Sequence, residues 1–393
     1  MAQNKDQKTL NVPPLRFPGF TDEWERVKVS DLLDFYSTNS LSWEMLNYED
    51  GDIQNLHYGL IHSGLPTLID LKRDTMPFVN ETAKPKKFTL CKEGDIAFAD
   101  ASEDTNDVAK AVEFINLDGQ QVISGLHTIH GRDNGNKTVV GFKGYAFASS
   151  AFHNQIRRIA QGTKIYSISS KSFDEVFISI PNKTEQTKIA RLLHLIDERI
   201  ATQNKIIDNL KSLIKGLRER FFNGSYSSYI SLGEIAELYQ PKTISTSDLE
   251  ETGYLVYGAN GIIGRYHAYN HELPQICITC RGNTCGQVTL TVPNSWITGN
   301  AMVVNIDGNK GINQSFLFHF LSSYNYSSII SGSGQPQIVR SPLAKIKVPN
   351  LDLKDQNKIS RILDSVTSKV ELEQNILSHL ELQKKHLVNL MFI

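Results

Sequence analysis

Hydrophobic positions along two long stretches of the chain alternate at spacings of four and three residues. The first stretch runs from Ile189 to Phe221 and the second from Ile359 to Met391, and neither contains proline. This alternation is typical of the heptad seam of a coiled coil. The seam positions are Ile189, Leu193, Ile196, Ile200, Gln203, Ile207, Leu210, Ile214, Leu217 and Phe221, and then Ile359, Leu363, Val366, Val370, Glu373, Leu377, Leu380, Lys384, Leu387 and Met391. The pattern predicts two helices of roughly 39 residues, each about 58 Å long.

The rest of the chain alternates apolar and polar residues over short stretches that end at Gly, Asn, Asp or Pro. Such stretches predict strands at 95–99, 121–123, 275–279 and 301–305. Longer apolar patterns predict helices at 146–158 and 314–330. We therefore expect an α+β fold with two globular α/β domains, each built on a small antiparallel or mixed sheet.

The sequence also repeats itself. Residues 185–193 match 355–363 position by position, at an offset of 170 residues. The same offset relates Gly162–Ile168 to Gly332–Ile338, whereas a weaker echo relates 29–34 to 232–237 at an offset of 203. A repeat of this length indicates a duplicated domain, not a solenoid.

The repeat divides the chain into five segments. They are an N-terminal segment (1–23), a first globular domain (24–181), a first spacer helix (182–224), a second globular domain (225–349) and a second spacer helix (350–393). If the ends of the second domain lie close together, its helix runs back antiparallel to the first, with an approximate two-fold axis between the copies. Gln203 and Glu373 occupy equivalent polar seam positions, and we expect them to meet and fix the coiled-coil register.

Composition restricts the function. The 393-residue chain has 41 Lys and Arg against 42 Asp and Glu, and this balance excludes a polybasic mode of nucleic-acid binding but not a locally positive DNA reader. Four cysteines are too few for a disulfide scaffold and favour a reducing compartment. The chain shows no signal-peptide h-region and no bilayer-length apolar run, so we expect a soluble, cytoplasmic protein without membrane contact.

Motifs for catalysis and metal binding are weak. Gly258–Gly264 has the spacing GxxGxxG and is not followed by an apolar helix, and GxxxxGK[ST] is absent. Asn11-Val12-Pro13-Pro14 departs from the Asn/Asp-Pro-Pro-aromatic element of amino-methyltransferases. Cys277 and Cys280 lie three apart on a predicted strand and face opposite sides, which disfavours a zinc site with Cys285. We expect no catalytic residue, metal or cofactor in this chain.

Polar and aromatic residues concentrate in the glycine-rich loops, where Arg and Lys can address guanine and Asn and Gln can address adenine. The candidate DNA contacts are His57, Tyr58, Lys164, Tyr166, Asn260, Arg265, Tyr266, Arg281, Asn283, Thr284, Gln335 and Gln337. Carried on two spaced domains, this set suits a bipartite DNA target.

The whole chain resembles the DNA-specificity subunit of type I restriction–modification systems. The resemblance rests on the opening Pro14–Trp24, on the two Glu/Asp-Gln-x-Lys-Ile-x-Arg-Leu/Ile-Leu helix starts, and on the stretches Gly94–Asp104 and Thr279–Gly286. It implies a non-catalytic subunit in which each target-recognition domain reads one half of an interrupted double-stranded DNA site. The paired helices would act as a ruler and as the docking surface for partner subunits.

The implied partners are two methyltransferase subunits, which use S-adenosylmethionine to methylate adenine. Two ATP- and Mg-dependent translocase/nuclease subunits can join them and cleave unmodified DNA. Catalysis and cofactors would then belong to other chains. The alternative from a different class is a tandem-domain scaffold built on a coiled-coil rod without DNA specificity; a DNA-mimicking inhibitor would be strongly acidic, and this chain is not.

Overall fold

The computed structural model describes residues 10–259, 261–332 and 334–393. The chain forms two compact units. Unit 1 consists of Met1–Thr202 with Leu377–Ile393, and unit 2 consists of Gln203–Ile376. Both units contain helices and sheets, which confirms the α+β prediction.

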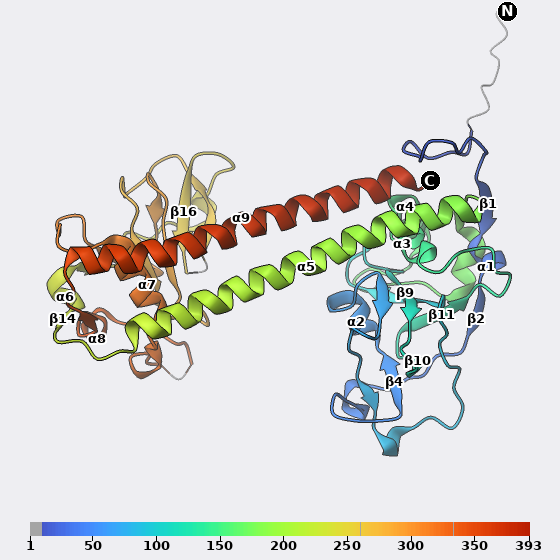
Figure 1. The fold of residues 1–393 in the computed structure, drawn as a ribbon, viewed down its shortest axis with the longest axis horizontal. Coiled ribbons are helices and arrows are strands. Elements are labelled where there is room, and N and C mark those ends of the chain that lie inside the picture. The colour runs from blue at the N-terminus through green and yellow to red at the C-terminus, as the bar shows by residue number, and fades with distance from the viewer. Residues whose placement is uncertain (1–9, 260, 333) are drawn as a thin grey trace, which may run out of the picture. The chain divides into compact units, whose positions relative to one another are not determined.

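Two long helices, labelled in Figure 1, contribute to both units. Helix α5 spans Lys183–Phe222 and helix α9 spans Leu353–Met391, with 40 and 39 residues respectively. The heptad pattern therefore predicted both helices correctly. None of the helices in the described part of the chain combines the length and the apolar character that crossing a bilayer would take.

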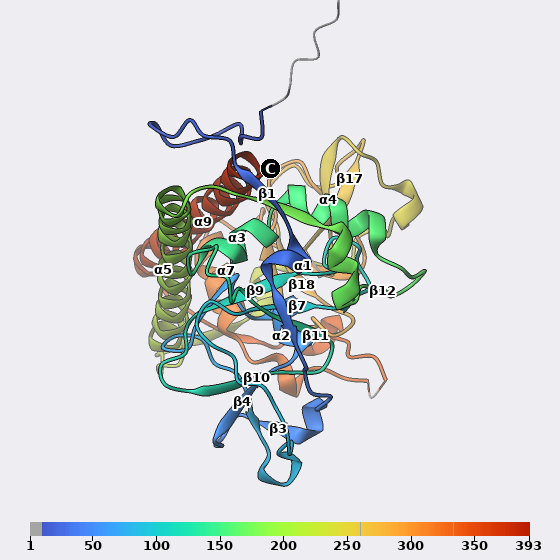
Figure 2. The same ribbon diagram turned by 90° about the vertical axis from the view of Figure 1, so that its right-hand side faces the viewer.

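Unit 1 contains a five-stranded sheet, ordered β2-β11-β7-β9-β5, and a four-stranded sheet, ordered β10-β4-β6-β3. Figure 2, which faces unit 1, shows β7, β9 and β11 in the middle and β3, β4 and β10 below them. The strands are β1 (Glu25–Lys28), β2 (Asp34–Tyr36), β3 (Leu46–Asn47), β4 (Ile53–Leu56), β5 (Leu68–Asp70), β6 (Phe78–Val79), β7 (Ile96–Ala99), β8 (Ala101–Ser102), β9 (Ala111–Asn116), β10 (Gln121–Ser124), β11 (Thr128–Arg132), β12 (Tyr166–Ser167) and β13 (Phe177–Ile180). Its short helices are α1 (Val29–Leu32), α2 (Tyr58–Ser63), α3 (Phe142–Phe147) and α4 (Ser150–Ile159).

Unit 2 is a reduced copy of the same design. Its larger sheet has the order β15-β21-β18-β19, and its smaller sheet has the order β17-β16-β20. The strands are β14 (Tyr229–Ser231), β15 (Glu237–Tyr239), β16 (Tyr254–Gly258), β17 (Gly261–Tyr266), β18 (Ile276–Thr279), β19 (Val288–Leu290), β20 (Trp296–Ile297), β21 (Ala301–Asn305) and β22 (Lys347–Pro349). The short helices are α6 (Leu232–Ile235), α7 (Gln314–Ser323) and α8 (Arg340–Ala344).

Strand pairing shows how the two units correspond. In unit 1, β4 pairs in parallel with β10, and in unit 2, β16 pairs in parallel with β20. The order β2-β11-β7-β9 in unit 1 matches β15-β21-β18-β19 in unit 2, with every one of these pairs antiparallel. The duplication inferred from sequence is thus a duplication of topology.

Helices α5 and α9 pack against each other within each unit. In unit 1, Leu193 of α5 and Val388 of α9 belong to one buried apolar cluster; in unit 2, Phe222 and Leu363 do. Also within unit 2, the Nε2 of Gln203 donates to the backbone oxygen of Glu373 at 3.0 Å and to its carboxylate. Lys369 and Gln203 hold the pKa of Glu373 below its ordinary value. The two seam positions therefore meet, as expected.

One buried glutamine at the start of each long helix explains the repeated sequence motif. Gln186 in α5 and Gln356 in α9 are each 1% exposed, and each makes three hydrogen bonds with its amide group. The partners are Val139 N, Lys137 O and Pro181 O for Gln186, and Asn313 N, Gly311 O and Leu351 O for Gln356. The motif therefore fastens each helix to its own unit.

The N-terminal segment covers part of unit 1. Trp24 is 3% exposed and packs edge-on against Phe392 near the end of the chain. Arg16 forms two hydrogen bonds, of 2.6 and 2.8 Å, with the fully buried carboxylate of Glu185. The segment Pro14–Trp24, on which the family resemblance rests, thus has a structural role here.

Two helix predictions were too long. Ser149 separates α3 from α4, because its hydroxyl oxygen accepts a hydrogen bond from the amide of Phe152 and caps the second helix. The helix expected at 314–330 ends at Ser323, and Asn325 caps a separate 3-10 turn, Tyr326–Ser328. Side-chain capping of this kind competes with continued helix.

Candidate nucleic-acid interface

Several predicted DNA contacts of unit 1 gather where three strands and a loop converge. We call this region corner 1 and define it as residues 57–58, 100–102, 127 and 161–167. The amide of Asp100 donates to the carbonyl of His127 at 3.1 Å. The amide of Ile168 donates to Asp100, and Tyr166 pairs with Ser102.

Unit 2 builds the same region from equivalent backbone bonds. Corner 2 comprises the described residues 259, 280–284, 299–300, 331–332 and 334–337. The Cys280 amide donates to Asn300 at 3.1 Å, as Asp100 does to His127, and the Ile338 amide donates to Cys280 at 3.0 Å. Each unit thus holds the matching segments with the same hydrogen bonds.

The loops 161–167 and 331–337 show this equivalence most clearly. Gln161 and Ser167 exchange two backbone hydrogen bonds, and so do Ser331 and Gln337. Gly162 and Gly332 both have positive φ, of 142° and 94°. A Cβ at either glycine would collide with the backbone carbonyl oxygen three residues on, so glycine is required at this turn. The sequence repeat at these loops therefore encodes a shared hairpin.

In corner 1, two of the predicted contacts sit in an aromatic cluster. His57 is 3% exposed, accepts a hydrogen bond from the Gly59 amide as the N-cap of α2, and contacts the ring of Trp43. Burial, and then the neighbouring His127, lower the pKa of His57. Tyr58 is half-buried and meets His127 edge-on at 5.2 Å. His57 therefore supports the corner, and Tyr58 lies nearer its surface.

His127 and Asp100 form the exposed polar part of corner 1. Their Nδ1 and Oδ1 atoms are 3.1 Å apart, with side chains 50% and 29% exposed. His127 has φ of 54°, an unfavourable backbone conformation for a residue with a side chain. A cleft of about 530 Å³ opens beside this pair. His127 is not among the contacts predicted from the sequence, and the strained backbone that marks it becomes visible only in three dimensions.

The remaining predicted residues of unit 1 lie on the loop 161–167. Lys164 is exposed at its turn, and Tyr166 is half-buried in β12. Corner 1 therefore brings together all four of the predicted contacts in unit 1: His57, Tyr58, Lys164 and Tyr166.

Corner 2 collects five of the predicted residues. Arg281 and Gln337 face each other across a backbone bridge. Gln335 lies on the same loop as Gln337 and is exposed, as is Asn283. The hydroxyl of Thr284 donates to the carbonyl of Ala259 at 3.4 Å, which joins the loop after β18 to the end of β16.

Two predicted residues lie elsewhere in unit 2, and one cannot be placed. Arg265 and Tyr266 are at the far end of β17 from its turn. Arg265 donates to the carbonyl of Gly253 at 2.8 Å, and Tyr266 packs edge-on against Trp296. Both are thus engaged in the hairpin itself. Asn260 lies outside the described residues.

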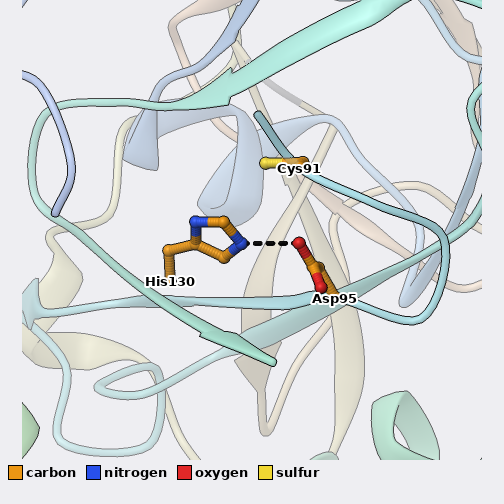
Figure 3. Close-up of side chains that lie close together, drawn as sticks. All are labelled: Cys91, Asp95 and His130. Carbon is orange, nitrogen blue, oxygen red and sulfur yellow. Dashed lines mark hydrogen bonds and ion pairs between the residues drawn. The ribbon is translucent and has the colours of Figure 1, made fainter. Parts of the chain in front are cut away.

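A buried polar cluster behind corner 1 fastens β7 to β11. Figure 3 shows Cys91, Asp95 and His130, whose ligand-type atoms lie within 4.8 Å of one another. The Asp95 carboxylate already receives two hydrogen bonds from Arg132, both 2.7 Å, and lies 2.7 Å from His130 Nε2. Burial would raise the pKa of Asp95, but Arg132 and His130 hold it below its ordinary value.

This cluster has the chemistry of an ion pair and not of a metal centre. Burial raises the pKa of Cys91 and keeps its thiol protonated, whereas a metal would take the thiolate. A metal would also have to displace Arg132 from the carboxylate. The cluster instead fixes β11, the strand that begins directly after His127.

The described part of unit 2 contains three free cysteines, of which Cys277 and Cys280 are buried and Cys285 is partly buried. Burial raises the pKa of Cys277 to about 12, and it also raises the pKa of Cys280. The amide of Gln240 lies 2.8 Å from the Cys280 sulfur. These thiols behave as small packing groups.

Comparisons with known proteins agree with this architecture. The family described as the type I restriction modification DNA specificity domain matches the chain twice, over residues 21–212 and 227–382. The chain is 24% identical over 279 residues to the type I restriction enzyme MjaVIII specificity subunit of Methanocaldococcus jannaschii, which covers 59% of this chain and 64% of the relative. It is 30% identical over 139 residues to the EcoprrI specificity subunit of Escherichia coli, which covers 34% of each. The matched stretch is therefore less than two thirds of either relative's own length.

Solved structures share the fold. A type I restriction–modification S subunit from M. genitalium aligns with a TM-score of 0.62 and 19% identity, over 97% of this chain and 99% of that one. A chain from a structural study of complex assembly and conformational transition in the type I system aligns with a TM-score of 0.56 and 14% identity, over 93% and 96%. The two matches to the family domain together cover most of this chain. The chain therefore belongs to the family of type I restriction–modification DNA specificity subunits.

Proposed function

We propose that this chain recognises a bipartite, interrupted DNA sequence and directs adenine methylation of that sequence by two modification subunits. Each unit reads one half-site. Two translocase/nuclease subunits can join the assembly and restrict unmodified DNA. S-adenosylmethionine, ATP and Mg belong to these partners in the proposal, and this chain supplies no catalytic residue.

The observation that carries the proposal is the pair of corners. Corner 1 and corner 2 have equivalent backbone hydrogen bonds but expose different side chains: a His–Asp pair in one and an arginine beside two glutamines in the other. Base edges in the major groove differ in their donors and acceptors, so equivalent frames with different side chains suit two different half-sites. A chain of the same fold was solved in a study of complex assembly in the type I system, which supports partner subunits for this chain.

The length of the helices supports a spaced target. At 1.5 Å per residue, the 40 residues of α5 extend about 60 Å, whereas one turn of B-DNA is roughly 34 Å. The near-neutral chain also fits a reader whose partners hold much of the phosphate backbone.

The decisive experiment maps adenine methylation in cells that express a cognate modification subunit with and without this chain. A new interrupted motif that needs the chain is the expected result. Absence of any motif, although the two proteins co-purify, would contradict DNA specificity and favour the scaffold alternative.

A second experiment assigns the half-sites. Exchanging residues 24–180 for the equivalent region of another family member should change one half of the motif and leave the other half and its methylation intact. A change in both halves would contradict recognition of one half-site per unit.

A further inference from the structure

Corner 2 opens into a cleft of about 390 Å³ that two arginines line. Within the described residues, neither the Arg281 nor the Arg340 guanidinium forms a hydrogen bond or an ion pair. Both side chains are exposed. The other lining residues include the amides of Gln240 and Gln337 and no carboxylate. The cleft is therefore a concentration of hydrogen-bond donors with no acid to neutralise them.

Arg281 projects from a backbone that is fixed on both sides. It follows Cys280, which is fully buried at the end of β18. The Gly282 amide donates to Pro336 at 3.0 Å, and the Ile338 amide donates to Cys280 at 3.0 Å. An arginine held in this way loses little backbone freedom when it binds a ligand.

The same two bonds place Gln337 beside Arg281. The two hydrogen bonds lie on either side of the Arg281–Gln337 bridge. Arg281 and Gln337 are therefore a non-hydrogen-bonded antiparallel pair. In such pairs the two side chains project from the same face and lie closest to each other. A guanidinium and a carboxamide thus point together from corner 2.

These groups match one kind of ligand. The guanidinium fork donates two parallel hydrogen bonds to the O6 and N7 acceptors of guanine in the major groove, which adenine cannot accept at its N6 amino group. A phosphate group is bound by positive charge and does not require the fork geometry. Arg340, at the start of α8, can supply that positive charge. The absence of an acid from the lining favours an electronegative ligand of this type.

We propose that Arg281 reads a guanine in the half-site of unit 2 and that Arg340 contacts a nearby phosphate. This inference rests on the proposed function, since it assigns one base to one residue of the proposed reader. It requires a guanine in the half-site that remains after residues 24–180 are exchanged.

The test compares methylation motifs and binding for three variants in the full chain with its modification subunit. Arg281→Lys keeps the charge but removes the fork, so the preference for guanine at one position should fall roughly 5- to 150-fold. Arg340→Gln should leave the motif unchanged, weaken binding at all sites and reduce the salt slope by about one. Lys310→Gln is the matched control, because Lys310 is exposed beyond the opposite end of β21 and also loses one charge.

A second measurement changes the DNA instead of the contact residue. Replacing the guanine with 7-deazaguanine removes the N7 acceptor, and wild-type complex should bind this DNA more weakly, while Arg281→Lys complex should discriminate less. Guanine preference that survives Arg281→Lys together with equal binding of 7-deazaguanine DNA would overturn the inference. So would a unit 2 half-site without guanine. Failure of wild-type chain to produce any motif would instead refute the proposed function.

Discussion

Units 1 and 2 share a backbone plan but differ in the polar groups that they bury. In unit 1, Glu113 of β9 lies opposite Ile96 of β7 and is fully buried. The Nζ of Lys143 is 3.0 Å from the Oε1 of Glu113. At the equivalent position of β19, unit 2 has Leu290 opposite Ile276. Lys143 lies four residues after Val139, whose amide donates to Gln186. In unit 2, the amide of Asn313 donates to Gln356, and the residue four positions later is the buried Leu317. Unit 2 thus keeps the topology without this ion pair: Leu317 is buried, whereas Leu290 is exposed.

A second difference lies where the long helices meet the short ones. In unit 1, the Tyr145 hydroxyl donates to Asp197 at 2.7 Å, and Lys384 of α9 binds the same carboxylate. In unit 2, the residue equivalent to Tyr145 is His319. It lies between Arg218 of α5 and Asp364 of α9, at 2.9 and 3.0 Å.

These differences show which interactions the duplicated fold depends on. The backbone bonds of the corners and the two buried glutamines are the same in both units, whereas charged pairs and exposed side chains are not. The frame is therefore common to the two units, whereas the side chains that it carries differ between them.

The largest expected effect tests the buried ion pair of unit 1. Lys143→Leu leaves the Glu113 carboxylate buried without its cation, and should lower the free energy of unfolding of unit 1 by about 3–5 kcal/mol. Chemical denaturation followed by fluorescence can separate the units, because Trp24 belongs to the core of unit 1 and Trp296 to unit 2.

The double variant Glu113→Leu with Lys143→Leu gives unit 1 the residues of unit 2. Much of the stability should return, although the amides of Gly141 and Gly144 then lose the acceptor that Glu113 provides. A double variant as unstable as Lys143→Leu would show that those amides, and not the unpaired charge, decide the loss.

The next effect tests the N-terminal segment, which no described part of unit 2 matches. Arg16→Gln removes the bidentate partner of the buried Glu185 carboxylate and should destabilise unit 1 by about 1–3 kcal/mol. Asp355, the repeat equivalent of Glu185, is exposed in the first turn of α9. Asp355→Asn is therefore the matched control, with a loss of at most about 1 kcal/mol in thermal melting.

The third prediction concerns Gln186 and Gln356, the buried glutamines whose hydrogen bonds are equivalent in the two units. Gln186→Leu and Gln356→Leu each leave one amide and two carbonyls without their partner, and each should cost about 1–2 kcal/mol in the unit concerned. Equal losses, measured as changes in denaturation midpoint, support equivalence. A loss in one unit only would contradict it.

The smallest effect concerns pH. Burial, and then Arg218, lower the pKa of His319, although Asp364 opposes the shift. The unfolded chain therefore takes up this proton at a higher pH than the folded chain, so stability is complete above about pH 6.5 and falls as the pH drops below it. His319→Gln should flatten the pH dependence of unit 2 melting between pH 7.5 and 5.5 by on the order of 1 kcal/mol. An unchanged slope would assign that dependence to other histidines, such as His271, whose pKa burial also lowers.

Some features of the site could be predicted because they are local. The heptad alternation requires only the side-chain pattern of each helix, and the glycines of the hairpin loops mark turns that no other residue fits. Arg281 and Gln337 were both identified from loop composition, but nothing in the sequence shows that residues 56 positions apart form a bridged pair. The role of His57 as the buried N-cap of α2 also depends on tertiary structure, because residue type alone suggests only a DNA contact.

The sequence by itself determined the duplication, the two long helices, the polar seam pair and the family, since all of these depend on periodicity and on position along the chain. Only the tertiary structure decided which loops form a corner, that Arg340 joins Arg281 in one cleft, and that Asp95 belongs to a buried ion pair. Contacts between distant segments depend on how strands pair in three dimensions, and strand pairing leaves no fixed spacing in the sequence.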